Sequence, residues 1–265
     1  MSLLLPGMHV PADSPIHQLD PRVKMGATLM LMALPFAAPS ALSSALLATL
    51  VAVIAFLSDA PLSALLRTLR TVFWLGFFMF FFYLFTTPGR SLIAWRGITV
   101  TADGLLLGAT QIYRLSLLVV LSSLLTFTTS PAQLTQGVEA LLAPLDRLGV
   151  PVRELSVVLT IALSFVPTIF DQVDRITKAQ RARGADFRSG APWRRVKSWV
   201  PTFVPIFVAA FRRANELARA MEARGFQGAR RRTHLHQLRL TRWDLVAALT
   251  VIASGFVIVM VSQLP

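Results

Sequence analysis

Five apolar runs limit what this chain can fold into. They lie near residues 23–38, 41–58, 68–86, 104–128 and 243–262. Several of them approach the roughly 20 residues that a helix needs to cross a bilayer. The chain is 54% hydrophobic, and its mean hydropathy is +0.62. These features predict an all-α, polytopic protein with about five transmembrane helices, which has the lipid bilayer as its surroundings.

Positive charge is concentrated in one part of the chain and predicts its orientation. The net charge is +13 at pH 7, and residues 175–242 hold 17 basic against three acidic side chains. Such a surplus marks nucleic-acid-binding proteins or the cytoplasmic face of membrane proteins, and the apolar runs favour the second class. We therefore expect no nucleic-acid partner. The prediction is a multi-pass protein of the cytoplasmic (inner) membrane with a cytoplasmic N-terminus.

The connection between the third and fourth runs, residues 87–103, is predicted to lie outside. Arg90 and Arg96 are its only basic residues. Its β-branched stretch from Ile98 to Thr101 predicts a small extended element within the loop.

A further apolar segment at 154–170 is predicted not to cross the membrane. A crossing there would place the arginines that follow it outside the cell, against the positive-inside rule. Val166, Ile169 and Phe170 recur at helical spacing, while charged residues occupy the other faces just beyond them. The pattern indicates an amphipathic helix at the cytoplasmic interface.

A second long amphipathic helix is predicted to follow Pro201. Phe203, Phe207 and Phe211 lie on its apolar face. Prolines at 201 and 205 fit near the first turns of this helix, because proline further along would bend or interrupt it.

Both amphipathic segments end on the same tripeptide, Ala-Arg-Gly. The copies are Ala182-Arg183-Gly184 and Ala223-Arg224-Gly225. Arginine before glycine is an ordinary way to end a helix, because glycine adopts the left-handed cap and the cation meets the negative helix end. The guanidinium is also a rigid fork that binds carboxylates. Two copies in equivalent places favour two docking tips over two caps.

The sequence contains no recognisable catalytic centre. It has no cysteine, no phosphate-binding Gly-x-x-x-x-Gly-Lys loop, no His-Glu-x-x-His and no Gly-x-Ser-x-Gly motif. We therefore assign no catalytic residue, no metal ligand and no cofactor. Arg114, inside the fourth run, is a functional candidate because ionisable residues are costly in the membrane.

Two other functions remain open from the residues alone. A membrane-embedded enzyme acting on a phosphorylated lipid would need a carboxylate or histidine cluster, for which Asp171 and Asp174 are the candidates. Their basic neighbours make this pair more typical of a solvated helix face. A conventional importer permease would form a homodimer with one coupling element in each subunit, which the doubled tripeptide makes less necessary.

The chain resembles the transmembrane (T) component of energy-coupling factor transporters, which are importers of the ATP-binding-cassette class. The resemblance rests on Ser14 to Lys24 (SPIHQLDPRVK), Thr129 to Pro131, Leu145, Gly149 to Pro151, Phe165 to Pro167, Ala179 to Asp186 (AQRARGAD) and Met221 to Phe226 (MEARGF). These segments cover most of the chain in the family's order, and the paired Ala-Arg-Gly tips are the most specific of them.

The resemblance implies a division of the chain and a set of partners. Residues 1–129 would hold the N-terminal membrane helices, 130–240 a cytoplasmic coupling-helix region, and 241–265 the last transmembrane helix. The partners would be two ATPase subunits and a small membrane protein, the S component, that binds a vitamin or metal ion.

The resemblance also implies roles for individual residues. Arg183 and Arg224 would each dock into one ATPase, with Ala182, Gly184, Ala223 and Gly225 allowing close approach. The S component would contact the apolar faces of the two coupling helices, at Val166, Ile169, Phe170, Phe203, Phe207 and Phe211.

Overall fold

The chain forms two compact units. A computed structural model describes residues 14–37, 40–95, 98–185, 192–228 and 240–263. The first unit combines Met1–Ala140 with Gln237–Pro265, and the second is Leu141–His236. Asp186, the last residue of one motif used above, lies outside the described residues.

The first unit is a bundle built from the five predicted apolar runs. Its helices are α1 (Pro21–Ala37), α2 (Ala41–Leu57), α3 (Leu62–Thr86), α4 (Ala102–Thr128) and α8 (Arg242–Ser262). The short α5 (Pro131–Leu142) follows α4. Because the bilayer core offers no hydrogen-bond partners, helices are expected for runs of this kind, and the all-α class is confirmed.

The apolar helices of the chain differ in whether they are long enough to span a membrane. In the described part of the chain, α3, α4, α6 (Val152–Ala182) and α8 are long and apolar enough to span a membrane. The 17-residue α1 and α2 rise only about 26 Å each at 1.5 Å per residue. For α6, length and composition permit a span, so its predicted place at the cytoplasmic interface still rests on the positive-inside argument.

The core of the first unit lies where α1, α2, α4 and α8 meet. Seven buried side chains form it: Leu31, Leu34, Leu47, Val51, Leu117, Leu121 and Ile258. The phenol of Tyr113 on α4 donates a hydrogen bond to the Ser44 carbonyl of α2, at 2.5 Å. Apolar packing with a few interhelical hydrogen bonds is the usual way in which membrane helices associate.

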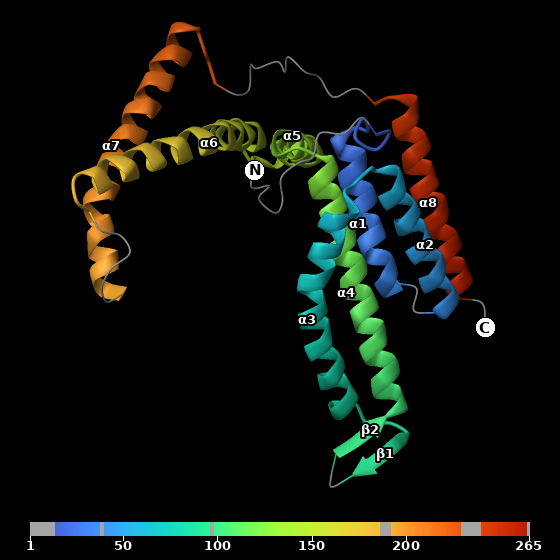
Figure 1. Cartoon of the computed structure of the whole chain (residues 1–265). Coiled ribbons are helices and arrows are strands. Elements are labelled where there is room, and N and C mark those ends of the chain that lie inside the picture. Colours follow the sequence, from blue (N-terminus) through green and yellow to red (C-terminus); the bar gives the residue numbers. More distant parts are fainter. Residues whose placement is uncertain (1–13, 38–39, 96–97, 186–191, 229–239, 264–265) are drawn as a thin grey trace. The chain divides into compact units, whose positions relative to one another are not determined.

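Helices α3 and α4 lie side by side and are joined by a hairpin, as Figure 1 shows. Strands β1 (Ser91–Trp95) and β2 (Ile98–Thr101) pair antiparallel, so the extended element predicted at 98–101 is present. Thr101 ends the hairpin and begins α4, because its hydroxyl accepts the Gly104 N–H at 3.1 Å and donates to the Thr87 carbonyl at 2.9 Å.

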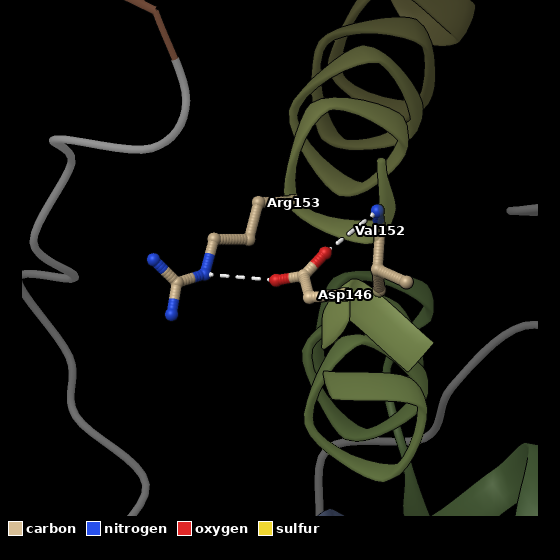
Figure 2. Close-up of polar contacts among 3 residues, drawn as sticks. All are labelled: Asp146, Val152 and Arg153. Carbon is tan, nitrogen blue, oxygen red and sulfur yellow. Dashed lines mark hydrogen bonds and ion pairs between the residues drawn. The ribbon is translucent and has the colours of Figure 1, made fainter. Parts of the chain in front are cut away.

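The second unit contains a short 3-10 helix η1 (Ala143–Leu148), then α6 and α7 (Pro192–Ala223). Asp146 organises the corner between η1 and α6. Its carboxylate accepts the Val152 N–H at 3.1 Å and lies 3.3 Å from the Arg153 guanidinium, as Figure 2 shows. One side chain thus satisfies a free amide at the start of α6.

Helix α7 begins earlier than the sequence predicts. It starts at Pro192, so Pro201 and Pro205 lie inside the helix instead of in its first turns. Each interior proline removes one backbone hydrogen bond, which membrane-associated helices tolerate by bending or by satisfying the freed carbonyl elsewhere. The amphipathic pattern continues on both sides of the two prolines. We infer that this continuous apolar face outweighs the tendency of proline to interrupt a helix.

Glycine is required where α4 approaches α3. A Cβ atom on Gly104 would lie 2.8 Å from the Tyr83 carbonyl oxygen, whereas one on Gly26 in α1 would meet nothing within 4 Å. We expect Gly104→Ala to destabilise the detergent-solubilised protein by about 1–3 kcal/mol through overpacking, and Gly26→Ala to be neutral or mildly stabilising. Thermal unfolding followed by size-exclusion chromatography measures both, and equal transition temperatures would contradict this packing.

Candidate docking site at the ends of two long helices

Helix α6 ends in a Schellman motif centred on the first Ala-Arg-Gly. Arg183 is the C-cap residue, and Gly184 follows in the left-handed conformation with φ of 88°. The Ala185 N–H donates to the Gln180 carbonyl at 3.0 Å, and the Gly184 N–H donates to the Arg181 carbonyl at 3.0 Å. Both bonds satisfy carbonyls that the helix leaves without partners.

Helix α7 ends in the same motif. Its second bond runs from the Gly225 N–H to the Glu222 carbonyl at 2.9 Å, and Gly225 has φ of 71°. The Phe226 N–H donates to the Met221 carbonyl at 3.0 Å. Arg224 therefore holds the same position relative to its helix end as the arginine of α6. The duplication in sequence is a duplication in backbone geometry.

The two glycines are required by backbone conformation, not by crowding inside the chain. A Cβ atom on Gly184 or on Gly225 would meet nothing within 4 Å. The left-handed region is nonetheless unfavourable for residues with a side chain. Among the residues that the structure describes, the space beside each glycine is open, which would allow another protein's backbone to approach closely.

Both arginines are exposed and available for binding. Within the described part of the chain, neither the Arg183 nor the Arg224 side chain makes a hydrogen bond or an ion pair. By contrast, the Lys178 ammonium of α6 lies 2.5 Å from the Asp174 carboxylate. Each fixed helix end thus presents a free guanidinium fork that matches a carboxylate or a group of carbonyls.

The alanines before the arginines, Ala182 and Ala223, are exposed as well. A methyl group is the smallest side chain that still favours a helix. Each tip therefore consists of one long cationic side chain between two small residues.

Helices α6 and α7 cross and contact each other (Figure 1). The most buried residues of the two helices include Thr177 on α6, and Thr202 and Ala209 on α7. The Arg213 guanidinium of α7 lies 6.0 Å from the centre of the Phe165 ring on α6. The crossing therefore leaves most of the large apolar side chains of both helices uncovered.

All six predicted S-component contacts remain exposed. Their exposed fractions run from 40% for Ile169 to 70% for Phe170. The six residues are Val166, Ile169, Phe170, Phe203, Phe207 and Phe211. Sequence reasoning missed Val204 and Val208, which are each 62% exposed and extend this surface. Their spacing of four residues along the helix was a signal that could have identified them.

The remaining candidates do not form a catalytic centre. Asp171 and Asp174 are exposed on α6, and among the described residues no group of three or more His, Cys, Asp or Glu side chains could hold a metal ion. Arg114 belongs to the first unit, where its guanidinium carbon lies 5.2 Å from the centre of the Phe36 ring. A cation–π contact of this kind stabilises an arginine in an apolar setting.

Comparison with known proteins gives a consistent result. Residues 12–235 match the model of the CbiQ family, described as cobalt transport protein. Three relatives are each named energy-coupling factor transporter transmembrane protein EcfT. The protein of Acidaminococcus fermentans is 43% identical over 247 residues, which cover 93% of this chain and 92% of the relative.

The other two relatives match over similar lengths. The protein of Ruminiclostridium cellulolyticum is 41% identical over 255 residues, covering 96% of each chain. That of Thermosediminibacter oceani is 43% identical over 253 residues, covering 96% of this chain and 94% of the relative.

The left-handed conformation of Gly184 and Gly225 should hold the two helix ends closed against local unfolding. Gly184→Ala and Gly225→Ala should each weaken the helix end by about 1–2 kcal/mol, because alanine is strained at these φ values. Asparagine tolerates this region, so Gly184→Asn and Gly225→Asn serve as matched controls. Hydrogen exchange at the Ala185 and Phe226 amides should be roughly 5- to 30-fold faster in the alanine variants. Unchanged exchange would show that the tips do not depend on these caps.

Proposed function

The chain belongs to the CbiQ family of cobalt transport proteins, as a transmembrane component of the energy-coupling factor type, and from this premise we propose that it couples ATP hydrolysis to solute uptake. In this proposal two ATPase subunits dock on its two Ala-Arg-Gly tips, and their movement reaches a small S component that binds the substrate. The relatives are named as transmembrane proteins of a transporter, so the chain is a non-catalytic subunit.

The observation that carries the proposal is the identical geometry of the two tips. Each helix ends in the same two Schellman bonds, followed by an exposed arginine that has no side-chain partner among the described residues. Two equivalent binding elements in one chain suit two equivalent partners, such as a pair of ATPases. A guanidinium held on a fixed helix end binds carboxylate and carbonyl oxygens with little loss of conformational freedom.

The arrangement of α6 and α7 supports transmission of movement between the partners. Both are long helices that touch each other at a crossing, so displacement of one tip changes the angle between them. The ATPases would supply the displacement, because this chain contains no phosphate-binding loop. The role is therefore mechanical and requires no cofactor in this chain.

The exposed apolar faces of α6 and α7 are the proposed contact surface for the S component. Large apolar side chains that remain exposed together mark a surface that binds protein or lipid. The S component could slide along such a face, because apolar contacts are non-directional. The transported solute is proposed to be a vitamin or a metal ion.

The proposed location is the cytoplasmic membrane, with the N-terminus and the second unit on the cytoplasmic side. The positive-inside argument supports this orientation, since residues 175–242 hold 17 of the 26 basic residues. ATP is available on that side, which fits ATPases docked at Arg183 and Arg224.

Removing the two arginines tests the docking role. Truncating one member of a buried, hydrogen-bonded charge pair costs about 2–5 kcal/mol, or roughly 30- to several-thousand-fold in affinity. We expect Arg183→Ala and Arg224→Ala each to weaken ATPase retention and slow uptake, and the double variant to abolish both. Quantitative co-purification with the ATPases gives the measurement.

Two control variants sharpen this test. Arg183→Lys with Arg224→Lys keeps the charge but loses the planar fork, so retention should be intermediate. Arg175→Ala removes an exposed charge two turns before the tip of α6 and should have little effect. Normal retention and transport in the double alanine variant would refute the docking role.

Removing two aromatic rings from the apolar face of α7 tests the proposed contact with the S component. Phe207→Ala with Phe211→Ala should leave the stability of the chain nearly unchanged, because both rings are at least 60% exposed. The variant should retain the ATPases but lose the S component from the purified complex. Phe73→Ala with Phe78→Ala, at exposed rings of α3, is the matched control. Equal S-component recovery in both variants would contradict the assignment of this face.

A further inference from the structure

Three charged side chains lie buried together in the first unit and take no part in the proposed docking. Asp20 and Lys24 are each 6% exposed, and Asp244 is 2% exposed. Burial of charges is costly unless they are paired and hydrogen-bonded. A cluster of this kind in a membrane bundle therefore calls for a specific function or a specific structural need.

Lys24 joins the N-terminal segment to the end of α4. Its ammonium donates to the His17 carbonyl at 2.9 Å and to the Thr128 carbonyl at 3.1 Å. Thr128 is the last residue of α4, so its carbonyl has no partner within the helix. A cation at this end also interacts favourably with the helix dipole.

Asp244 joins the same N-terminal segment to the start of α8. Its carboxylate accepts the Thr241 N–H and the Asp20 N–H, each at 2.7 Å. Asp20 in turn caps α1, because its side chain accepts the Arg22 N–H at 2.9 Å. The N-terminal segment is therefore held to α4 by Lys24 and to α8 by Asp244.

These two helix ends stand on either side of the second unit along the chain. The chain leaves the first unit after Ala140 and returns at Gln237. Thr128 comes shortly before the exit, and Thr241 shortly after the return. The start of α8 and the end of α4 are thus both fixed by one cluster.

Helix α5, which leads to the exit, rests on the first turns of α1. A Cβ atom on Gly137 of α5 would lie 2.9 Å from the Met25 sulfur and 3.3 Å from the Pro21 Cβ. The contact is close enough that only glycine fits without a shift. Helix α5, through Gly137, and the start of α8, through Asp244, are therefore both attached at the start of α1.

We propose that Lys24, Asp20 and Asp244 are positioning residues that anchor both chain connections to the coupling helices on α1. Movement of α6 and α7 that enters the first unit is then passed to α1 and α8 together. This inference rests on the proposed function, since it needs ATP-driven movement of α6 and α7.

A variant that tests this proposal has to keep the buried charges of the cluster balanced. Removing Lys24 alone leaves two buried carboxylates without a cation, a change that usually destabilises strongly. Lys24→Met combined with Asp244→Asn removes one charge of each sign and keeps the side-chain volumes. This double variant leaves one buried carboxylate, Asp20, instead of two, so it should be destabilised less than Lys24→Met alone and should assemble while lacking the ionic anchor.

Hydrogen exchange on the complete complex, with its ATPases and S component, tests the inference. It is measured with and without ATP plus vanadate, and needs no knowledge of the transported solute. In the wild type we expect ATP-dependent changes in α6 and α7 and also in α1 and α8. In the double variant the changes in α6 and α7 should persist, while those in α1 and α8 should be lost.

The outcomes separate the two proposals. If α6 and α7 do not respond to ATP in the wild type, the proposed function itself fails. If they respond and the double variant still transmits the full change to α1 and α8, only the anchoring role is overturned.

A milder variant covers the case in which the double variant does not assemble. Asp244→Asn alone keeps one acceptor oxygen for one of the two amide protons that the two carboxylate oxygens accept, so it should fold and transmit less of the change. Asp59→Asn is the matched control, because Asp59 is exposed and its φ of 48° suits asparagine. Equal transmission in these two variants would overturn the anchoring role.

Discussion

Helix ends are the constraint on which this structure depends, because a helix leaves backbone groups at both ends that an apolar environment cannot satisfy. In the first unit charged side chains meet this need: the Lys24 ammonium binds the last carbonyl of α4, and the Asp244 carboxylate caps α8. In the second unit the chain satisfies its own carbonyls through two Schellman motifs. The first solution fixes helices to one another, and the second leaves each tip free for a partner.

This difference connects the two units to one proposed mechanism. Each Schellman motif already satisfies two carbonyls of its tip, so the arginine is the strong and directional group that a partner would engage. A long helix carries displacement of that group to the crossing of α6 and α7. In the proposal, Lys24 and Asp244 then pass it to the helices of the bundle that they join to α1. Each step depends on rigid elements joined at defined points, and none depends on chemistry performed by this chain.

The sequence was informative wherever structure follows from local pattern. Apolar length located the five bundle helices, and glycine after arginine located both tips. Local pattern failed at Pro201 and Pro205, where the amphipathic face of a long helix outweighed the usual effect of proline. It also could not pair Asp20 with Asp244, because residues 224 positions apart leave no shared signal in one sequence. The sequence likewise could not show whether the apolar faces of α6 and α7 cover each other, because this depends on the angle and position at which the two helices cross.

The proposed coupling requires that one copy of this chain, with its two tips, engage two ATPase subunits. Native mass spectrometry of the complex purified from its host in mild detergent measures that stoichiometry directly. We expect one copy of this chain with two ATPase subunits and one small membrane protein. Two copies of this chain in each complex would indicate a conventional homodimeric permease, and recovery of the chain alone would reduce both tips to ordinary helix caps.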